Sequence, residues 1–336
     1  IINWINYYII FCIFYFKTFN INNSVEKQRQ ETFNMKKLYN FNFVSKFKIA
    51  NLASIFLTLI SLILISFKGL NYGIDFKGGT LIELRVESDK VTITDVRSAF
   101  SNMNLGDLNV KEFGKKGDYL IKFEKKEFNK NSNIKSIKEN VISKLGADVN
   151  FRRIENVGPK VSAELLNSGL LAISLALGAM LFYIWVRFEW QFSLGSITAI
   201  FHDVLITLGI FSLLSLEVNL SIVAAVLTIV GYSMNDTVVI YDRIRENLSK
   251  YSSSTIEDIS NTSINETLSR TIITSITTLL ALGSIFVLGG EILKGFSLAM
   301  IIGVIIGTYS SIFVASPILK YLRVSYKSIA KDEEKN

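Results

Sequence analysis

Long apolar runs without charge dominate the chain, and short charged connections separate them. A helix needs about 20 apolar residues to cross a hydrocarbon core of about 30 Å. Six runs reach or approach this length, although a His–Asp pair interrupts the third and one aspartate interrupts the fourth. They lie at residues 49–67, 165–186, 190–216, 218–241, 271–290 and 295–319. The pattern therefore predicts a polytopic α-helical membrane protein with six transmembrane helices.

Residues 70–160, between the first two runs, are rich in charge and show a different periodicity. Alternating apolar positions predict strands, and apolar positions three or four apart predict helices. The predicted strands cover residues 80–86, 108–113, 118–123 and 147–154, with a turn at 114–117, and the predicted helices cover 94–103 and 134–145. This β-α-β-β-α-β order predicts a small α+β domain of the ferredoxin-like kind.

Lysine and arginine concentrate on one side of the predicted spans, which indicates the cytoplasmic side. These residues precede the first span and follow the second, fourth and sixth: Lys36, Lys37, Lys46, Lys48, Arg187, Arg243, Arg245, Lys320, Arg323 and Lys327. We therefore expect both termini inside the cytoplasm and the α+β domain outside it. The predicted units are a cytoplasmic N-terminus with the first helix (35–68), the outer domain (69–160), a bundle of five helices (161–322) and a polar cytoplasmic tail (323–336).

The first 34 residues form a separate unit. Residues 1–16 are uncharged and aromatic-rich, but no basic stretch precedes them and no small-residue cleavage site follows, as a signal peptide would require. The first methionine is Met35, followed by two lysines. We expect translation to begin at Met35 and residues 1–34 to be a non-native or disordered extension; the alternative is a membrane anchor.

Composition supports a membrane protein, with 49% hydrophobic and 19% charged residues and a mean hydropathy of +0.36. An average soluble domain is about 25% charged. The net charge is +7, but the basic residues lie beside apolar runs and not among interleaved aromatic residues. This pattern indicates contact with membrane lipid and no nucleic-acid partner. One cysteine and one histidine rule out an intramolecular disulfide and argue against a metal site built from these residues.

The fourth run contains the segment Gly231-Tyr232-Ser233-Met234-Asn235-Asp236-Thr237. An aspartate at the centre of a membrane helix costs about 2.5–3.5 kcal/mol on insertion scales, so we take Asp236 as the leading functional candidate. On a helix, five polar or small residues fall in one sector with Asp236: Ser221, Thr228, Gly231, Tyr232 and Asn235. Such a face suits a neighbouring helix or a hydrated path. The alternative is simple packing between helices, which explains a carboxylate less well.

Arg270, at the cytoplasmic start of the fifth run, is the candidate cation for Asp236, because the two residues are expected at a similar depth. Thr274, Thr277, Ala281 and Ser284 follow it at helical spacing and form a stripe of small and polar residues. A nearby cation favours the ionised carboxylate, whereas desolvation favours the protonated one. A movement that separates the pair would tilt this balance, as a proton-coupled switch requires. The alternative for Arg270 is an anchor at the membrane surface.

His202 and Asp203 interrupt the third run. Neighbouring residues on a helix point about 100° apart, so we do not expect these two to form a dyad by themselves. With Thr198 and Thr207 they form a candidate extension of the polar network, which would include Thr228, Tyr232 and Thr274. The alternative is a satisfied polar pair in the core. In the sixth run, Ala299, Gly303 and Gly307 form a face for close helix packing.

The sequence lacks the G-x-S-x-G, Walker A and H-E-x-x-H patterns, so we do not expect an enzyme. Five segments instead resemble a known family. They are GIDFKGGT (73–80), NVGPKVSAEL (156–165), RFEWQFSLG (187–195), the run 201–247 that contains GYSMNDTVVIYDRIREN, and TLSRTIITSITTLL (267–280). Together they resemble the SecD/SecF family of bacterial protein-export membrane proteins, over nearly all of the chain after Met35.

The resemblance implies a protein of the inner membrane with a periplasmic domain, related to the two halves of resistance-nodulation-division (RND) transporters. It implies SecD as the other half, and the SecYEG translocon, YajC and an unfolded preprotein as partners. It implies no cofactor, with H⁺ or Na⁺ as the coupling ion of an export process driven by the proton motive force. The Asp of N-D-T and the Arg of S-R-T in the family are implicated in ion coupling and match Asp236 and Arg270; Asn235 precedes the aspartate.

The G-x-D-F-x-G-G-T element of the family matches Asp75, Gly78 and Gly79, for which we expect a structural hinge role near the outer membrane surface. Three other readings compete with an export subunit. A proton-driven RND exporter of small molecules would carry large outer domains in both halves. An intramembrane enzyme would need paired catalytic residues on facing spans. A passive translocon scaffold would use Asp236 and Arg270 only as a structural ion pair.

Overall fold

The computed structural model describes residues 41–88, 91–101, 103, 105–106, 108–112, 116–123, 130–146, 148–251, 253–326 and 328. The extension expected at 1–34 lies outside the described residues, as do Met35, Lys36, Lys37, Lys327, part of the predicted turn at 114–117 and most of the predicted tail. Within the described part, six helices are long and apolar enough to cross a membrane. The prediction of a polytopic helical membrane protein is therefore confirmed.

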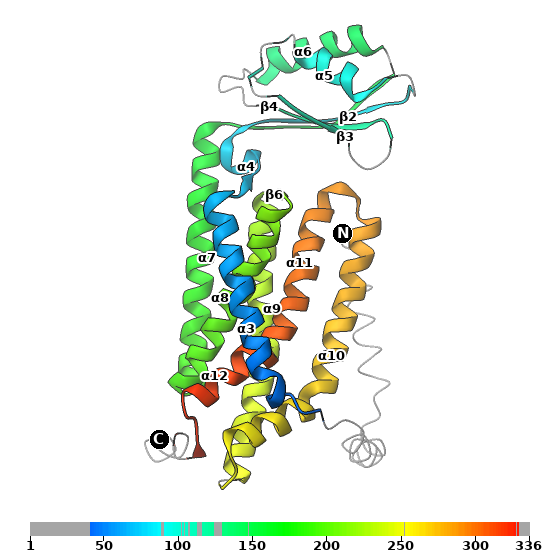
Figure 1. Cartoon of the computed structure of the whole chain (residues 1–336). Coiled ribbons are helices and arrows are strands. Elements are labelled where there is room, and N and C mark those ends of the chain that lie inside the picture. Colours follow the sequence, from blue (N-terminus) through cyan, green and yellow to red (C-terminus); the bar gives the residue numbers. More distant parts are fainter. Residues whose placement is uncertain are drawn as a thin grey trace, which may run out of the picture.

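The six spans stand side by side as a bundle (Figure 1). A short turn, η1 (Val44–Lys46), leads into the first of them. The first five are α3 (Phe47–Phe67), α7 (Pro159–Arg187), α8 (Trp190–Leu213), α9 (Leu220–Lys250) and α10 (Ile256–Leu288). The sixth is made of α11 (Gly290–Ser310), the π-helical turn η2 (Ser311–Ala315) and α12 (Ser316–Tyr321).

Three spans form the centre of the bundle and three lie outside it. Buried residues make up 50–56% of the apolar stretch in α8, α9 and the sixth span, but only 11–17% in α3, α7 and α10. Glycines let α11 approach α9 closely, because a Cβ atom at Gly303 would lie 2.3 Å from Cγ1 of Ile229, and one at Gly307 would lie 3.1 Å from Cβ of Ser233. The small-residue face predicted for the sixth span is thus a contact with α9.

Helices α9 and α10 are longer than the predicted spans at 218–241 and 271–290. Both continue past their apolar runs as a polar hairpin, in which the amide of Asn247 donates hydrogen bonds to Ser263 Oγ and Glu266 Oε2, both at 2.9 Å. Leu248 and Ile259 are buried at its core. An uncharged run marks only the part of a helix that lies in lipid, so the expected boundaries were too short.

Beyond α3 lies an α/β domain with the elements β2 (Gly79–Val86), α5 (Ile93–Ser101), β3 (Leu108–Glu112), β4 (Asp118–Phe123), α6 (Lys130–Leu145) and β5 (Val149–Val157). The strands form one antiparallel sheet in the order β3-β4-β2-β5. Helices α5 and α6 cover one face, and the other face points toward the membrane bundle (Figure 1). The strands and helices come in the order expected from the sequence.

The alternation along β2 explains these two faces. Ile82, Leu84 and Val86 are at most 3% exposed and pack in the core beneath α5 and α6. Glu83 and Arg85 lie between them in the sequence and therefore point to the opposite face. One face of the sheet thus forms an apolar core, while the face toward the bundle carries charge.

Short elements join the domain to the bundle. The two-residue strands β1 (Asn71–Tyr72) and β6 (Glu217–Val218) pair in parallel, and α4 (Ile74–Lys77) follows β1. Lys122 of β4 forms an ion pair with Glu217 of β6, which links the sheet to the end of the bundle. The apolar pattern did not predict β1 and β6, because a strand of two residues is too short to show a periodicity.

Candidate functional site

Asp236 lies in the middle of α9 and is 2% exposed. Its Oδ1 atom lies 3.5 Å from the side-chain nitrogen of Asn235, at the limit of a hydrogen bond. Its Oδ2 atom is buried and has no hydrogen-bond partner among the described residues. A carboxylate at membrane depth with an open oxygen requires a cation or a proton for charge balance.

Three hydroxyl groups on α9 and α10 also lack hydrogen-bond partners among the described residues. The side-chain oxygens of Tyr232, Thr237 and Thr271 are buried without a hydrogen-bond partner in the described part of the chain. Two of them lie within four residues of Asp236 on α9, and the third lies on α10, which packs against α9. Open acceptors and donors at this depth suit a site where an ion or proton binds transiently.

Arg270 lies on α10, which packs against α9, the helix that carries this carboxylate. Its charge acts electrostatically on Asp236, but no contact of ion-pair length joins the two side chains among the described residues. Arg270 is exposed on the surface of the chain. In this structure the two charges are therefore not in direct contact.

The predicted polar sector of α9 divides into a buried and an exposed part. Ser221, Thr228 and Asn235 are exposed, whereas Gly231 and Tyr232 are half-buried. On α10, Thr274 is half-buried and the rest of the stripe is exposed, namely Thr277, Ala281 and Ser284. Polar residues of two adjacent helices thus lie on the outer surface of this chain at membrane depth, where lipid would be a poor neighbour.

His202 and Asp203 form a second polar cluster within the bundle. They are 5% and 1% exposed, and His202 Nδ1 lies 2.8 Å from Asp203 Oδ1. The other carboxylate oxygen accepts hydrogen bonds from Ser233 of α9 at 2.5 Å and from Ser310 of α11 at 2.7 Å. The expectation that these neighbouring side chains point apart does not hold, because two buried polar side chains can turn toward each other despite their different helical directions.

The threonines proposed to extend this cluster do not join it. The hydroxyls of Thr198, Thr207, Thr228 and Thr274 each donate to a carbonyl of their own helix at 2.8–3.1 Å. This bond to the preceding turn is common for threonine in membrane helices. The candidate network is therefore two separate groups, one around Asp236 and one around Asp203.

The sequence analysis did not predict the ion pairs at the helix ends far from the sheet, because it used their arginines only as orientation signals. Arg187 lies 2.7 Å from Asp242, Arg245 lies 3.2 Å from the buried Glu189, and Arg243 pairs with Glu266. These pairs join α7, α8, α9 and α10. The sequence contains the carboxylates that pair with these arginines, but which carboxylate meets which arginine depends on how the helices pack.

The motif around Asp75 lies at the N-terminal end of α9. Asp75 Oδ2 accepts a hydrogen bond of 2.9 Å from the backbone nitrogen of Leu220, the first residue of that helix. Gly78 and Gly79 have φ angles of +78° and +128°, which side chains disfavour. A Cβ atom at Gly78 would also lie 3.3 Å from the carbonyl oxygen of Val157. The motif thus turns the chain sharply from α4 into β2, as a structural role requires.

Across the described residues, no group of three or more His, Cys, Asp or Glu side chains could hold a metal ion. The fold and the site together define a multi-pass helical membrane protein with isolated ionisable residues inside its spans. Comparison with known proteins identifies the family. Two family models match the chain. The model described as "Protein export membrane protein SecD/SecF, C-terminal" matches residues 137–325, and the one described as "SecD/SecF GG Motif" matches residues 63–90. The chain belongs to the SecD/SecF family, as the sequence motifs indicated.

Relatives of known name agree with this assignment. The chain is 45% identical over 280 residues to the protein translocase subunit SecF of Rickettsia bellii, a match that covers 83% of this chain and 92% of the relative. It is 43% identical over 290 residues to the SecF subunit of Cereibacter sphaeroides, covering 84% and 89% of the two chains.

Solved structures of SecDF share the fold. The crystal structure of SecDF from Thermus thermophilus, described as a translocon-associated membrane protein, superposes with a TM-score of 0.76 at 36% identity over 84% of this chain. A SecDF structure in a "super-membrane-facing form" gives a TM-score of 0.64 at 34% identity over 89% of this chain. The chain spans only 39% and 40% of those two SecDF chains.

Proposed function

We propose that this chain is a SecF-type subunit that pairs with SecD and assists SecYEG in moving unfolded preproteins across the bacterial inner membrane, driven by the proton motive force. The observation that carries the proposal is the exposed polar surface of α9 and α10 beside the buried carboxylate of Asp236. Polar groups facing lipid are unfavourable, so this surface requires a protein neighbour. The superposition of this chain on part of a SecDF chain supports SecD as that neighbour.

Ion coupling follows from the chemistry of Asp236. In the proposed cycle, Asp236 takes up and releases H⁺, or alternatively binds Na⁺, at the seam between the two subunits. Arg270 stabilises the ionised carboxylate and Asn235 orients it. One proton that moves down 100 mV releases about 2.3 kcal/mol, which shifts a two-state equilibrium roughly 50-fold. This is enough to favour one arrangement of the helices over another, and no cofactor or catalytic step is needed.

The contact between Asp75 and Leu220 offers a route from this site to the outer domain. The hydrogen bond joins α4 to the first residue of α9, the helix that carries Asp236. We propose that the α/β domain is ferredoxin-like, lies in the periplasm and follows the movement of α9, while both termini are cytoplasmic. A domain that moves in this way could hold or release an emerging preprotein. YajC and membrane lipid are further proposed partners.

Cysteine cross-linking tests the pairing with SecD. We expect Asn235→Cys, on the exposed polar surface, to cross-link to cysteines introduced along SecD in the membrane. Leu175→Cys, on the exposed apolar surface of α7, is the matched control and should not react. Equal yields at both positions, or none with Asn235→Cys, would reject the pairing and favour an exporter that works without SecD. Dissipating the H⁺ and Na⁺ gradients separately would then identify the coupling ion.

A further inference from the structure

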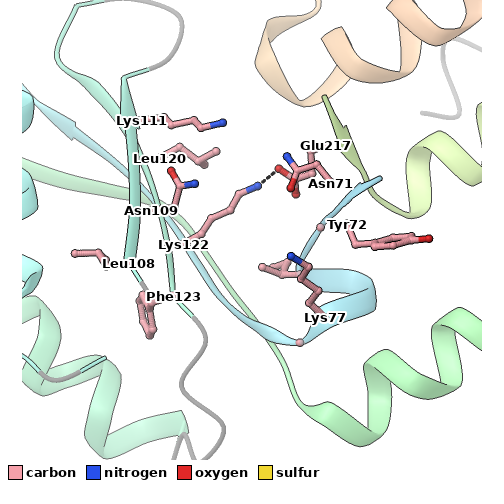
Figure 2. Close-up of a pocket in the computed structure, with 13 residues that line it drawn as sticks. Asn71, Tyr72, Lys77, Leu108, Asn109, Lys111, Leu120, Lys122, Phe123 and Glu217 are labelled. Carbon is pink, nitrogen blue, oxygen red and sulfur yellow. Dashed lines mark ion pairs between the residues drawn. The ribbon is translucent and has the colours of Figure 1, made fainter. Parts of the chain in front are cut away.

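A pocket separates the α/β domain from the outer end of the bundle (Figure 2). It has a volume of about 330 Å³, and its walls come from β3 and β4 on one side and from β1, α4 and β6 on the other. This volume lies within the range of small-ligand sites, about 300–1,000 Å³. The pocket is distinct from the groups around Asp236 and Asp203, and the proposed function gives it no role.

Lysines dominate the charge of this pocket. Lys77, Lys111 and Lys122 line it, whereas Glu217 is the one carboxylate among its described lining residues. Figure 2 shows the three lysine side chains directed into the space between the domain and the bundle. Glu217 pairs with Lys122, and among the described residues neither Lys77 nor Lys111 forms an ion pair. Two ammonium groups therefore face the pocket without a partner.

The positions of these charges carry an electrostatic cost. The side chain of Lys122 is only 22% exposed, and burial together with the nearby charge of Lys111 lowers its pKa to about 8. The carboxylate of Asp75 opposes this effect, but it is already engaged by the backbone of Leu220. An anion that binds between ammonium groups offsets their mutual repulsion.

The location of the pocket indicates the source of the anion. Helix α3 ends at Phe67 and α9 begins at Leu220, so β1, α4 and β6 lie where the spans leave the membrane. Tyr72, which is 41% exposed, has the amphipathic character of residues at the headgroup level. Leu108 and Leu120 add apolar surface to the polar lining. A phosphate attached to an acyl chain matches both the charge and the depth better than a soluble anion does.

We infer that this pocket binds the phosphate of an anionic phospholipid headgroup from the outer leaflet, held by Lys77, Lys111 and Lys122. Two of these lysines belong to the sheet and one to α4, so a bound headgroup connects the α/β domain to the membrane end of the bundle. Lysine binds phosphate as a compact point charge, without the fixed two-point geometry of arginine. The site would therefore select headgroup charge more strongly than headgroup shape.

Calorimetric titration of the full chain in uncharged detergent, at pH 7, tests this inference. The probes are short-chain phosphatidylglycerol, short-chain phosphatidylcholine and inorganic phosphate. We expect saturable binding of phosphatidylglycerol at one site, weakened at least about tenfold by Lys77→Gln combined with Lys111→Gln. The matched control combines Lys135→Gln with Lys144→Gln on α6, which covers the other face of the sheet, and should bind as the unmodified chain does.

A further variant and the other probes complete the test. Lys111→Arg keeps the charge and should retain most of the affinity, whereas Lys111→Gln alone should lose part of it. Lys77 and Lys111 are both exposed, so these substitutions should leave folding unaffected. Equal phosphatidylglycerol affinity in the Lys77/Lys111 double variant and its control would overturn the inference. Equally tight binding of inorganic phosphate or phosphatidylcholine would also overturn it, because the site would not then select an anionic lipid.

Discussion

The close contact between α9 and α11 makes a quantitative prediction at Gly303. A Cβ atom there would lie 2.3, 2.5 and 2.8 Å from three side-chain carbons of Ile229, which is 1% exposed. Isoleucine has one strongly preferred rotamer in a helix, so this side chain cannot swing aside without strain. Gly303→Ala should therefore destabilise the bundle, although alanine normally favours a helix over glycine by about 0.5–1 kcal/mol.

The magnitude follows from the overlap. Inserting a methyl group into a well-packed core costs about 1–3 kcal/mol. After the gain in helix propensity, the expected net loss is about 1–2 kcal/mol, which changes the ratio of folded to unfolded protein about 5–30-fold. Ile229→Ala alone should cost about 2–5 kcal/mol because it leaves a cavity. The added methyl group would partly fill that cavity, so the two changes together should cost less than their sum.

Equilibrium unfolding in mixed detergent micelles measures these differences. Gly178→Ala on α7 is the matched control, since a Cβ atom there meets nothing within 4 Å, and it should be neutral or slightly stabilising. A coupling energy of about 1 kcal/mol or more between Gly303→Ala and Ile229→Ala would support the packing described above. Unchanged stability in Gly303→Ala, or strictly additive losses, would refute it.

Three further predictions concern polar contacts. Asp203→Ala leaves buried donors without an acceptor and should cost about 1–3 kcal/mol for each, with a smaller loss for Asp203→Asn; equal stability of the two variants in thermal unfolding would contradict this. Asp75→Ala removes the acceptor for the backbone of Leu220 and should cost about 0.5–2 kcal/mol, seen as faster hydrogen exchange in the first turn of α9 but not in α10. Lys122 should lose its proton near pH 8 in NMR of ¹³C-labelled lysine, and Glu217→Gln should lower that midpoint. Because burial lowers this pKa, the unfolded chain binds more protons above pH 8, and stability should rise with pH from there toward 10.5; a midpoint at 10.5 would refute the burial of the ammonium.

The sequence predicted those features that depend on composition along one segment. The length of the apolar runs predicted the six spans, and the spacing of apolar positions predicted the strands and helices between the first two spans. An electrostatic relation of Asp236 to Arg270 was expected too, because the order of the spans places the two residues at a similar depth on neighbouring helices. In each case the determining information was local, or required only the order of neighbouring helices.

Features that depend on the packing of distant segments were not predictable. The carboxylate of Asp203 accepts bonds from Ser233 and Ser310, which lie 30 and 107 residues away. The ion pair between Lys122 and Glu217 joins two units of the fold that no periodicity connects. Helical directions alone gave the wrong answer for His202 and Asp203, because flexible side chains follow their hydrogen bonds.

The most direct test of the account measures export in vesicles that contain this chain, SecD and SecYEG. The quantity is the ratio of preprotein export rates with and without an imposed proton gradient. We expect a ratio well above one for the unmodified chain and close to one for Asp236→Asn, with unchanged assembly and unchanged export in the absence of the gradient. Asp236→Glu should keep part of the stimulation, and Glu139→Gln on the exposed surface of α6 should keep all of it. Full stimulation in Asp236→Asn would contradict ion coupling at this residue and leave the chain as a passive scaffold.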